Sequence, residues 1–361
     1  MSGQRVIRLL VACSALFALQ ATAEEGWTDV LDRPAATSPL ASRTLYNGLA
    51  QAGQRVVAVG QRGHIVYSDD GGKSWTQAVV PVSSDLVAVD FPTPELGWAV
   101  GHDGIILHTT DAGANWTRQL DGRELGQVLL DFYSAAVKDG TIEPPEEAER
   151  LAGEAQLFAD QGPENPFLSV FFENERQGFV VGAYNLILRT EDGGENWQPW
   201  LHRVENPRAM HLYAIDQVDG ETWITGEQGL LLKLNPEEQR FIAMQLPYEG
   251  TLFGLTGGPE GVIVFGLRGN AFHSNDAGLT WNKIETGLTV GLTSGSAAGE
   301  KIVLVSQAGH VLGSMDGGLS FTLAPVAQPQ PAAAVLALSP DALVVGGPRG
   351  LGAIALANDR Q

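Results

Sequence analysis

Short runs of alternating apolar and polar residues recur along the chain, and glycine or other turn-forming residues separate them. The stretch from Leu86 to Leu120 shows the pattern clearly, with the runs LVAVDF, GWAVG, GIILHTT and NWTRQL. Alternation with a period of two predicts β-strands that bury one face. Four such runs form one unit, and this unit returns along most of the chain.

Seven copies of the unit can be aligned on a turn of the form G-x-x-G. They begin at Gly60, Gly101, Gly182, Gly226, Gly266, Ser306 and Gly347. The starts are 40 to 44 residues apart, except for one interval of 81 that holds an insertion. Four strands in about 40 residues are typical of a propeller blade. We therefore expect an all-β fold, a seven-bladed β-propeller spanning residues 24–361.

The two ends of this propeller suggest how the ring closes. The seventh unit, residues 332–357, has runs for only three strands, VLALS, ALVVGG and LGAIAL. GWTDVLDR, from Gly26 to Arg33, resembles the fourth strands of other units. We predict that residues 26–33 form a strand that completes blade seven, because an open sheet edge invites unwanted pairing.

An eight-residue phrase also recurs at blade spacing. SDDGGKSW, residues 68–75, returns as TTDAGANW, TEDGGENW, SNDAGLTW and SMDGGLSF. The hydroxyl and the aspartate can bond nearby backbone N–H groups in an Asx-type turn, and the second glycine accepts a positive φ. The final aromatic can cover the blade edge. We predict a structural role for Asp70, Asp111, Asp192, Asp276, Asp316, Trp75, Trp116, Trp197, Trp281 and Phe321.

The fourth unit departs from this phrase, since Pro236 takes the place of the aspartate while Phe241 keeps the aromatic position. We expect the aromatic packing to persist there without the turn chemistry.

The pattern S/T-x-D-x-G-x-x-W/F is the Asp-box, or BNR repeat. With the preceding G-x-x-G turn, these units resemble the propeller family named for the photosystem II stability and assembly factors. The resemblance implies a non-enzymatic scaffold that helps a membrane protein complex assemble. Exported relatives in bacteria without photosystems are often encoded near RND-type transporters, so a transporter subunit is an alternative partner. The family carries an arginine-rich patch for its partner, and the matching residues here are Arg62, Arg268 and Arg349.

The variable residues of the G-x-x-G turns should share one face of the disc. On this face we predict a protein-binding surface that includes Arg62, His102, Tyr184, Arg268 and Arg349. Clustered arginines suit a carboxylate-bearing segment through paired N–H donors. The alternative is that arginine is simply tolerated in an exposed turn.

The insertion, residues 121–165, opens on the same face between blades two and three. Apolar residues spaced by three and four predict two helices, the second starting after Pro144 and Pro145. The segment carries eleven acidic residues against Arg123, Lys138 and Arg150. Two interpretations stay open: the hairpin packs on itself and on the disc, or it is a docking arm or lid.

The N-terminal residues predict export. Arg5 and Arg8 precede an apolar run from Leu9 to Leu19, which is too short to span a membrane. A signal peptide of residues 1–23, cut after Ala23, would remove the only cysteine. We expect a periplasmic, monomeric scaffold with no membrane insertion.

Charge narrows the range of partners. Without Arg5 and Arg8 the net charge of −20 becomes −22, which disfavours nucleic acid and anionic lipid. The recurring histidines follow blade geometry, so no metal and no cofactor are expected.

The alternative class is a sialidase-like glycoside hydrolase or a carbohydrate-binding propeller, since sialidases also carry Asp-boxes. Such enzymes need an arginine triad, a tyrosine nucleophile beside a glutamate, and an acid–base aspartate. Tyr184, Tyr213 and Glu227 are of suitable types, but the Arg-Ile-Pro signature is absent and the arginines fall in repeated turns. We expect no enzymatic activity and therefore no catalytic residue.

Overall fold

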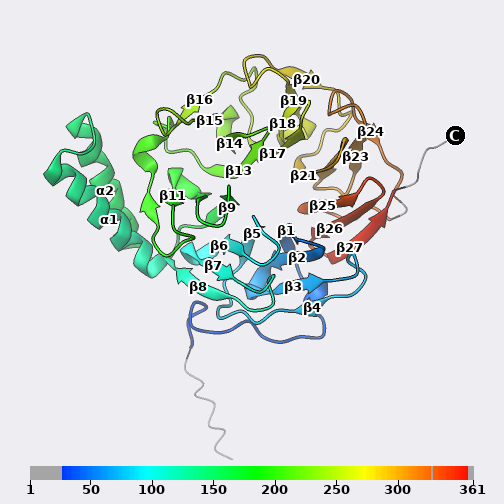
Figure 1. Cartoon of the computed structure of the whole chain (residues 1–361), viewed down its shortest axis with the longest axis horizontal. Coiled ribbons are helices and arrows are strands. Elements are labelled where there is room, and N and C mark those ends of the chain that lie inside the picture. Colours follow the sequence, from blue (N-terminus) through cyan, green and yellow to red (C-terminus); the bar gives the residue numbers. More distant parts are fainter. Residues whose placement is uncertain (1–26, 327, 357–361) are drawn as a thin grey trace, which may run out of the picture.

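The computed structural model describes residues 27–326 and 328–356. In this part of the chain the strands form seven antiparallel sheets arranged in a ring, six of four strands and one of three (Figure 1). The first strands of all seven sheets line one central cavity. The chain is a seven-bladed β-propeller, as the repeat predicts. The expected signal peptide lies outside the described residues.

Each sheet is one blade, and its strands run from the centre outward in chain order. Blades one to three contain β1 (Tyr46–Ala52), β2 (Arg55–Gly60), β3 (Ile65–Ser68), β4 (Thr76–Gln77); β5 (Leu86–Asp90), β6 (Gly97–Gly101), β7 (Ile106–Thr109), β8 (Thr117–Leu120); β9 (Phe167–Phe172), β10 (Gly178–Gly182), β11 (Ile187–Thr190), β12 (Gln198–Pro199). Blades four to seven contain β13 (Leu212–Val218), β14 (Glu221–Gly226), β15 (Leu231–Asn235), β16 (Arg240–Ala243); β17 (Leu252–Gly258), β18 (Gly261–Gly266), β19 (Ala271–Ser274), β20 (Asn282–Ile284); β21 (Leu292–Ala298), β22 (Lys301–Ser306), β23 (Val311–Ser314), β24 (Thr322–Leu323); β25 (Ala334–Ser339), β26 (Ala342–Gly347), β27 (Gly350–Ala355).

Helical elements lie only at connections. One-turn 3-10 helices join second to third strands in five blades: η2 (Gln61–Gly63), η3 (His102–Gly104), η4 (Ala183–Asn185), η6 (Glu227–Gly229) and η7 (Leu267–Gly269). Two others are η1 (Ala41–Arg43) and η5 (Leu201–Arg203). The insertion forms the expected hairpin, α1 (Gly122–Asp139) and α2 (Pro145–Gln161), outside the ring (Figure 1).

The two glycines of the G-x-x-G turn are required by close backbone approach. A Cβ on Gly60 would lie 2.0 Å from the Leu45 carbonyl oxygen, where the chain enters β1. Gly63 has a φ of +69°, and its Cβ would lie 2.1 Å from the Val82 oxygen, in the link that leads to blade two. A side chain at either position would push these connections apart. The repeat therefore has glycine where the turn passes the entry to the inner strand and where it passes the link to the next blade.

The polar side chains of the Asp-box turns form hydrogen bonds within their own turns. In blade one, Asp70 Oδ1 accepts from Ser68 Oγ (2.8 Å) and from the backbone N of Lys73 (3.0 Å) and Ser74 (2.9 Å), while Ser74 Oγ donates to Oδ2 (2.6 Å). Gly72 N donates to Ser68 Oγ (2.8 Å). Hydrogen bonds of the same kind, from hydroxyl and backbone N–H groups, form the turns that contain Asp111, Asp192, Asp276 and Asp316. Each turn is therefore held by its own side chains.

These turns also join neighbouring blades. A Cβ on Gly113 of blade two would lie 3.2 Å from Val57 of blade one. In the same way, Gly72 of blade one approaches Val344 on β26 of blade seven. The Asp-box of the first blade thus packs against the last blade and helps to close the ring.

Tyr46 seals the same seam from the inner side. It is fully buried beside Ala41, Trp75 and Leu351, and its hydroxyl donates to the Ala41 carbonyl oxygen at 2.9 Å. The inner strand β1 contacts β25 directly. The ring closes through packing between blade one and blade seven.

The predicted closing strand is not formed. Residues 27–33 have no strand structure, and the sheet of blade seven has three strands among the described residues. Leu31 is instead buried among apolar residues of blades one and two, and Ser83 N donates to the Val30 oxygen at 2.8 Å. Asp32 forms an ion pair with Arg123 at the start of α1, at 2.9 Å. These contacts hold the segment against blades one and two, so the prediction was wrong.

Blade four corrects a second expectation. Its third-to-fourth-strand turn keeps side-chain chemistry, because Asn235 Oδ1 accepts from the backbone N of Glu237 (3.0 Å) and Glu238 (3.1 Å). Phe241 is fully buried, as the aromatic position predicts. An Asx turn begun one residue before Pro236 replaces the Asp-box.

Loss of one Asp-box hydroxyl should destabilise the fold measurably. Thr109 is 2% exposed, and its Oγ1 accepts from Gly113 N at 3.1 Å. Thr109→Val keeps the shape but leaves a buried N–H unpaired, so we expect the free energy of unfolding to fall by about 1–3 kcal/mol in urea titrations. The adjacent exposed Thr110→Val is the control and should change it by less than about 0.5 kcal/mol. Equal effects of the two variants would contradict a structural role for the hydroxyl.

Candidate functional site

The turns between second and third strands form one surface, here called the G-x-x-G face. Arg62, Tyr184 and Arg268 occupy the same place in their turns, with φ of 57°, 54° and 58°. All three side chains are exposed. The repeat therefore presents one side chain at this place in each of five described blades, directed by a left-handed backbone.

The other two predicted face residues differ in setting. His102 is exposed but precedes the left-handed position of its turn, which Asp103 occupies with a φ of 59°. Arg349 is exposed in the tight hairpin between β26 and β27, where Gly350 takes the positive φ of 96°. Arg62, Arg268 and Arg349 lie in three separate blades, and the structure records no contact among them within the described residues.

Arg62 lines a groove that the sequence did not reveal. The N-terminal segment, residues 30–38, forms one wall of a cavity of about 810 Å³ whose other lining residues include Arg62, His64 and Asp85. Arg33 also lines it and is exposed. Within the described chain, neither guanidinium group has an ion-pair partner. The carboxylate of the groove, Asp85, accepts the backbone N of Arg62 through Oδ1 at 2.7 Å. Two unpaired cations thus share one groove.

A row of rings leads from the same face toward the centre. Tyr184 is 58% exposed, and its backbone N donates to His211 Nδ1 at 2.9 Å. Its ring meets His211 edge-on at 4.6 Å, and Tyr213 and Phe253 continue the row at 6.2 and 5.8 Å. Tyr213 and Phe253 line the central cavity. Apolar and aromatic groups therefore frame the mouth of the channel at this face.

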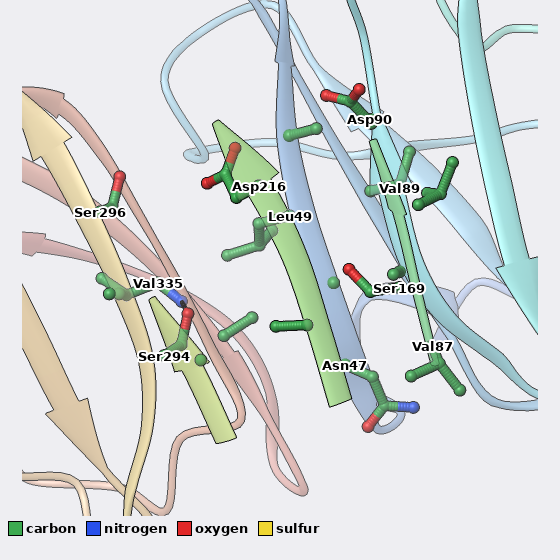
Figure 2. Close-up of a pocket in the computed structure, with 18 of the residues that line it drawn as sticks. Asn47, Leu49, Val87, Val89, Asp90, Ser169, Asp216, Ser294, Ser296 and Val335 are labelled. Atoms are coloured by element: carbon green, nitrogen blue, oxygen red, sulfur yellow. Dashed lines mark hydrogen bonds between the residues drawn. The ribbon is translucent and has the colours of Figure 1, made fainter. Parts of the chain in front are cut away.

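The central channel has a volume of about 460 Å³ and holds two carboxyl groups, Asp90 and Asp216 (Figure 2). Asp90 is the last residue of inner strand β5, and Asp216 is the fifth of the seven residues of inner strand β13. Both lie toward the Asp-box side of the channel, while Asn47 and Val87 lie at its other end (Figure 2). Asp90 Oδ2 accepts from the backbone N of Phe172 at 2.7 Å, which links blades two and three. Asp216 Oδ1 accepts from the N of its neighbour Gln217 at 2.7 Å.

The surrounding blades enclose both carboxyl groups, although Asp90 stays partly exposed and Asp216 stays exposed to the solvent of the channel. This burial raises the pKa of Asp90 to about 7, and the charge of Asp216 adds to the increase. Burial likewise raises the pKa of Asp216 to about 6. Sequence reasoning missed this pair, although a signal existed: LVAVDF and LYAIDQ each place an aspartate at the same point of an inner strand.

The Asp-box carboxylates behave in the opposite way. The hydroxyl of Ser320, with its backbone N and Ser314, lowers the pKa of Asp316 to about 2. The Thr280 hydroxyl does the same for Asp276, also to about 2. These groups stay ionised with their oxygens occupied, which does not suit acid–base catalysis. Across residues 27–326 and 328–356, no group of three or more potential metal ligands comes together.

The helical insertion buries the apolar residues that predicted it. Leu125, Leu129 and Tyr133 of α1 pack with Leu151 and Phe158 of α2 in one core with blade three. At the first turn of α1, Asp121 is 2% exposed, and its Oδ1 accepts from Arg123 N at 2.9 Å. The hairpin is thus fixed to the disc by a real core, leaving an acidic outer surface.

Within the described residues, no helix has the length and apolar character needed to cross a membrane.

The channel carboxyl groups should make stability depend on pH. The ordinary aspartate pKa is 3.8, so between about pH 4 and 6 folded Asp216 keeps a proton that the unfolded chain releases. Stability therefore falls as pH rises through this window. Asp216→Asn should lose that part of the fall and show a higher Tm than wild type at pH 8, measured by thermal unfolding at pH 4, 6 and 8.

The exposed hairpin residue Asp219 provides the control. Asp219→Asn removes one carboxylate outside the channel and should follow the wild-type pH profile. Parallel profiles for Asp216→Asn and wild type would show that Asp216 is ordinarily ionised in the channel.

Comparison with known proteins supports the propeller and names its family. A family model described as photosynthesis system II assembly factor YCF48 matches residues 48–128 and 160–262, just over half of the chain. The photosystem II assembly lipoprotein Ycf48 of Synechococcus sp. (strain CC9902) is 31% identical over 121 residues, which span 32% of this chain and 36% of that protein. The match thus covers only about a third of the curated relative.

Solved structures share the fold at low identity. YCF48 bound to a D1 peptide superposes with a TM-score of 0.62 at 18% identity, covering 88% of this chain and 95% of that one. YCF48 from Cyanidioschyzon merolae gives 0.61 at 14%, covering 91% and 99%. The WD40 propeller domain of Doa1 gives 0.60 at 10%, covering 91% and 97%. Fold, repeat and family model agree, and the chain belongs to the YCF48-like family of photosystem II assembly factor propellers.

Proposed function

We propose that this chain is a non-enzymatic scaffold that binds an acidic segment of a membrane protein and assists assembly of its complex. The G-x-x-G face is the binding surface, with the groove that contains Arg33 and Arg62 as its centre. The observation that carries this proposal is the pair of unpaired guanidinium groups in one groove, on a chain whose net charge is −20. Guanidinium groups bind carboxylates through parallel N–H donors, so an acidic peptide is the matching ligand.

The remainder of the face extends this surface. Four further exposed residues lie in the turns between second and third strands of other blades: His102, Tyr184, Arg268 and Arg349. The solved YCF48 relative with a bound D1 peptide supports a peptide ligand for a propeller of this shape. The partner is a photosystem-like membrane complex, or alternatively an RND-type transporter subunit.

Export to the periplasm belongs to the same proposal. The curated relative is named a lipoprotein, which supports an exported location. The predicted signal peptide would deliver the scaffold, as a monomer, to the side of the membrane where exposed segments of a partner emerge.

The enzymatic alternative has weaker support. A sialidase needs three arginines on one substrate carboxylate, whereas Arg62, Arg268 and Arg349 make no contact with one another in the described chain. The Asp-box carboxylates are tied into their turns, and the raised pKa values of Asp90 and Asp216 occur inside the channel.

Charge reversal in the groove should abolish partner binding. Arg33→Glu with Arg62→Glu replaces two cations by two anions, so we expect an acidic partner segment to bind at least about tenfold more weakly. The measurement is crosslinking and affinity capture of membrane proteins from the native envelope, followed by titration of the crosslinked segment. Arg268→Glu tests separately whether the contact extends over the face.

Lys73→Glu with Lys283→Glu is the matched control, because both lysines are exposed outside the G-x-x-G face. This variant makes the same charge change and should bind like wild type. Equal loss in both double variants would reduce the effect to net charge. Release of sugar from sialosides by the purified protein, with no partner captured, would favour the glycosidase.

A further inference from the structure

Blade seven ends one strand short of its neighbours. β27 pairs with β26 along its whole length, from Gly350 opposite Gly347 to Ala355 opposite Ala342. In the other six blades the third strand pairs on its outer side with a fourth strand. Among the described residues no strand pairs with the outer side of β27, and in Figure 1 it forms the rim of the ring.

This edge lacks the features that normally prevent strand pairing. Natural edge strands carry charges, proline or bulges, or are covered by another element. β27 has the sequence GLGAIA, with no charge and no proline, and its register with β26 is regular. Ala353 and Ala355 are exposed. The strand is therefore chemically open to another extended segment.

A groove runs beside this edge and supplies apolar contact. A cavity of about 400 Å³ lies along β27, lined on the far side by Val305 and Val311 of blade six and by Val326 in the link. Blade seven also has no Asp-box turn in the described chain to pack toward blade six, as the other Asp-boxes pack toward their preceding blades. An added strand that carries an apolar residue would fill this cavity, as the Asp-box turn and fourth strand fill the corresponding space in other blades.

Two arginines mark the end of the site. Arg349 directly precedes β27, and Arg43 of η1 lies against its first residue, since a Cβ on Gly350 would be 2.7 Å from the Arg43 Cα. Both are exposed, and neither forms an ion pair with a described residue. In an antiparallel pair the last residues of the added strand lie beside the first residues of β27. An acidic residue or terminal carboxylate there would meet both cations.

We propose that the outer edge of β27 binds an extended segment of a partner protein, which pairs antiparallel as a fourth strand and places a carboxylate beside Arg43 and Arg349. This is recognition by strand addition, in which backbone bonds give affinity and side-chain pockets give selectivity. The site goes beyond the proposed function, because it uses the rim of the disc and, although it shares Arg349 with the proposed binding face, needs neither Arg33 nor Arg62.

A fourth strand from this chain provides a probe of the right chemistry. Residues 115–121, NWTRQLD, contain the aromatic residue and β8 of blade two and end in an acid. Added to the full mature chain, this peptide should slow hydrogen exchange at least about tenfold at those amides of residues 351–355 that point away from β26. The peptide NWTPPLD cannot donate from its central residues and should give no protection. A peptide ending in lysine should bind more weakly, and Arg43→Glu with Arg349→Glu should reverse that preference.

A protein variant supplies the second arm. Replacing residues 355–361 by a copy of Ser314–Ala324, which keeps the repeat register, gives blade seven its own Asp-box and fourth strand. This chain should no longer bind the peptide, while the Arg33→Glu, Arg62→Glu variant should bind it like wild type. The proposed function and this site therefore fail in different variants.

Three results would overturn the site. Slow exchange, in the free protein, of the amides of residues 351–355 that point away from β26 would mean that the chain already covers its own edge. Protection that grows with protein concentration, together with a dimer in light scattering, would make a second copy the occupant. Peptide binding that survives the appended strand would place the contact elsewhere.

Discussion

The architecture depends on the hydrogen-bonded Asp-box turn between the third and fourth strands, which recurs in five of the described blades. Its hydroxyl and carboxylate hold two successive left-handed residues, Ala112 and Gly113 in blade two, and that backbone lets the turn approach the preceding blade closely, as Gly113 approaches Val57. The same turn of the first blade packs against Val344 of the last blade. The ring therefore closes without a strand shared between its two ends. Closure is a property of the repeat itself.

A repeat that uses its conserved polar groups for closure leaves function to the positions it does not constrain. The Asp-box carboxylates are saturated by their own turns, and their lowered pKa values follow from those bonds. The variable positions are the third residue of each G-x-x-G turn and the residues that face the channel. Arg62 and Tyr184 occupy the first kind of position, and Asp90 and Asp216 the second. Chemistry differs between blades only where the fold permits it.

Local patterns predicted what local physics determines. Alternating runs, Asp-box phrases and helical spacing predicted the blades, their turns and the α1–α2 hairpin, because those features depend on residues within one repeat. GWTDVLDR misled because its likeness to a fourth strand says nothing of the buried site for Leu31 or of the ion pair between Asp32 and Arg123. The groove joining Arg33 to Arg62 was hidden for the same reason. Both depend on where a non-repeating segment lies on the finished disc.

The misplaced strand also explains why blade seven differs from the rest. Since residues 27–33 are held against blades one and two, they are not available to pair with β27. The ring tolerates this loss because its seam is made by Tyr46, η1 and the first Asp-box, all of which contact blade seven from the other side. Closure does not require a fourth strand in blade seven, so β27 is not held by the outer pairing that fixes the third strand in the other six blades. The backbone groups along its outer edge can then serve binding without weakening the fold.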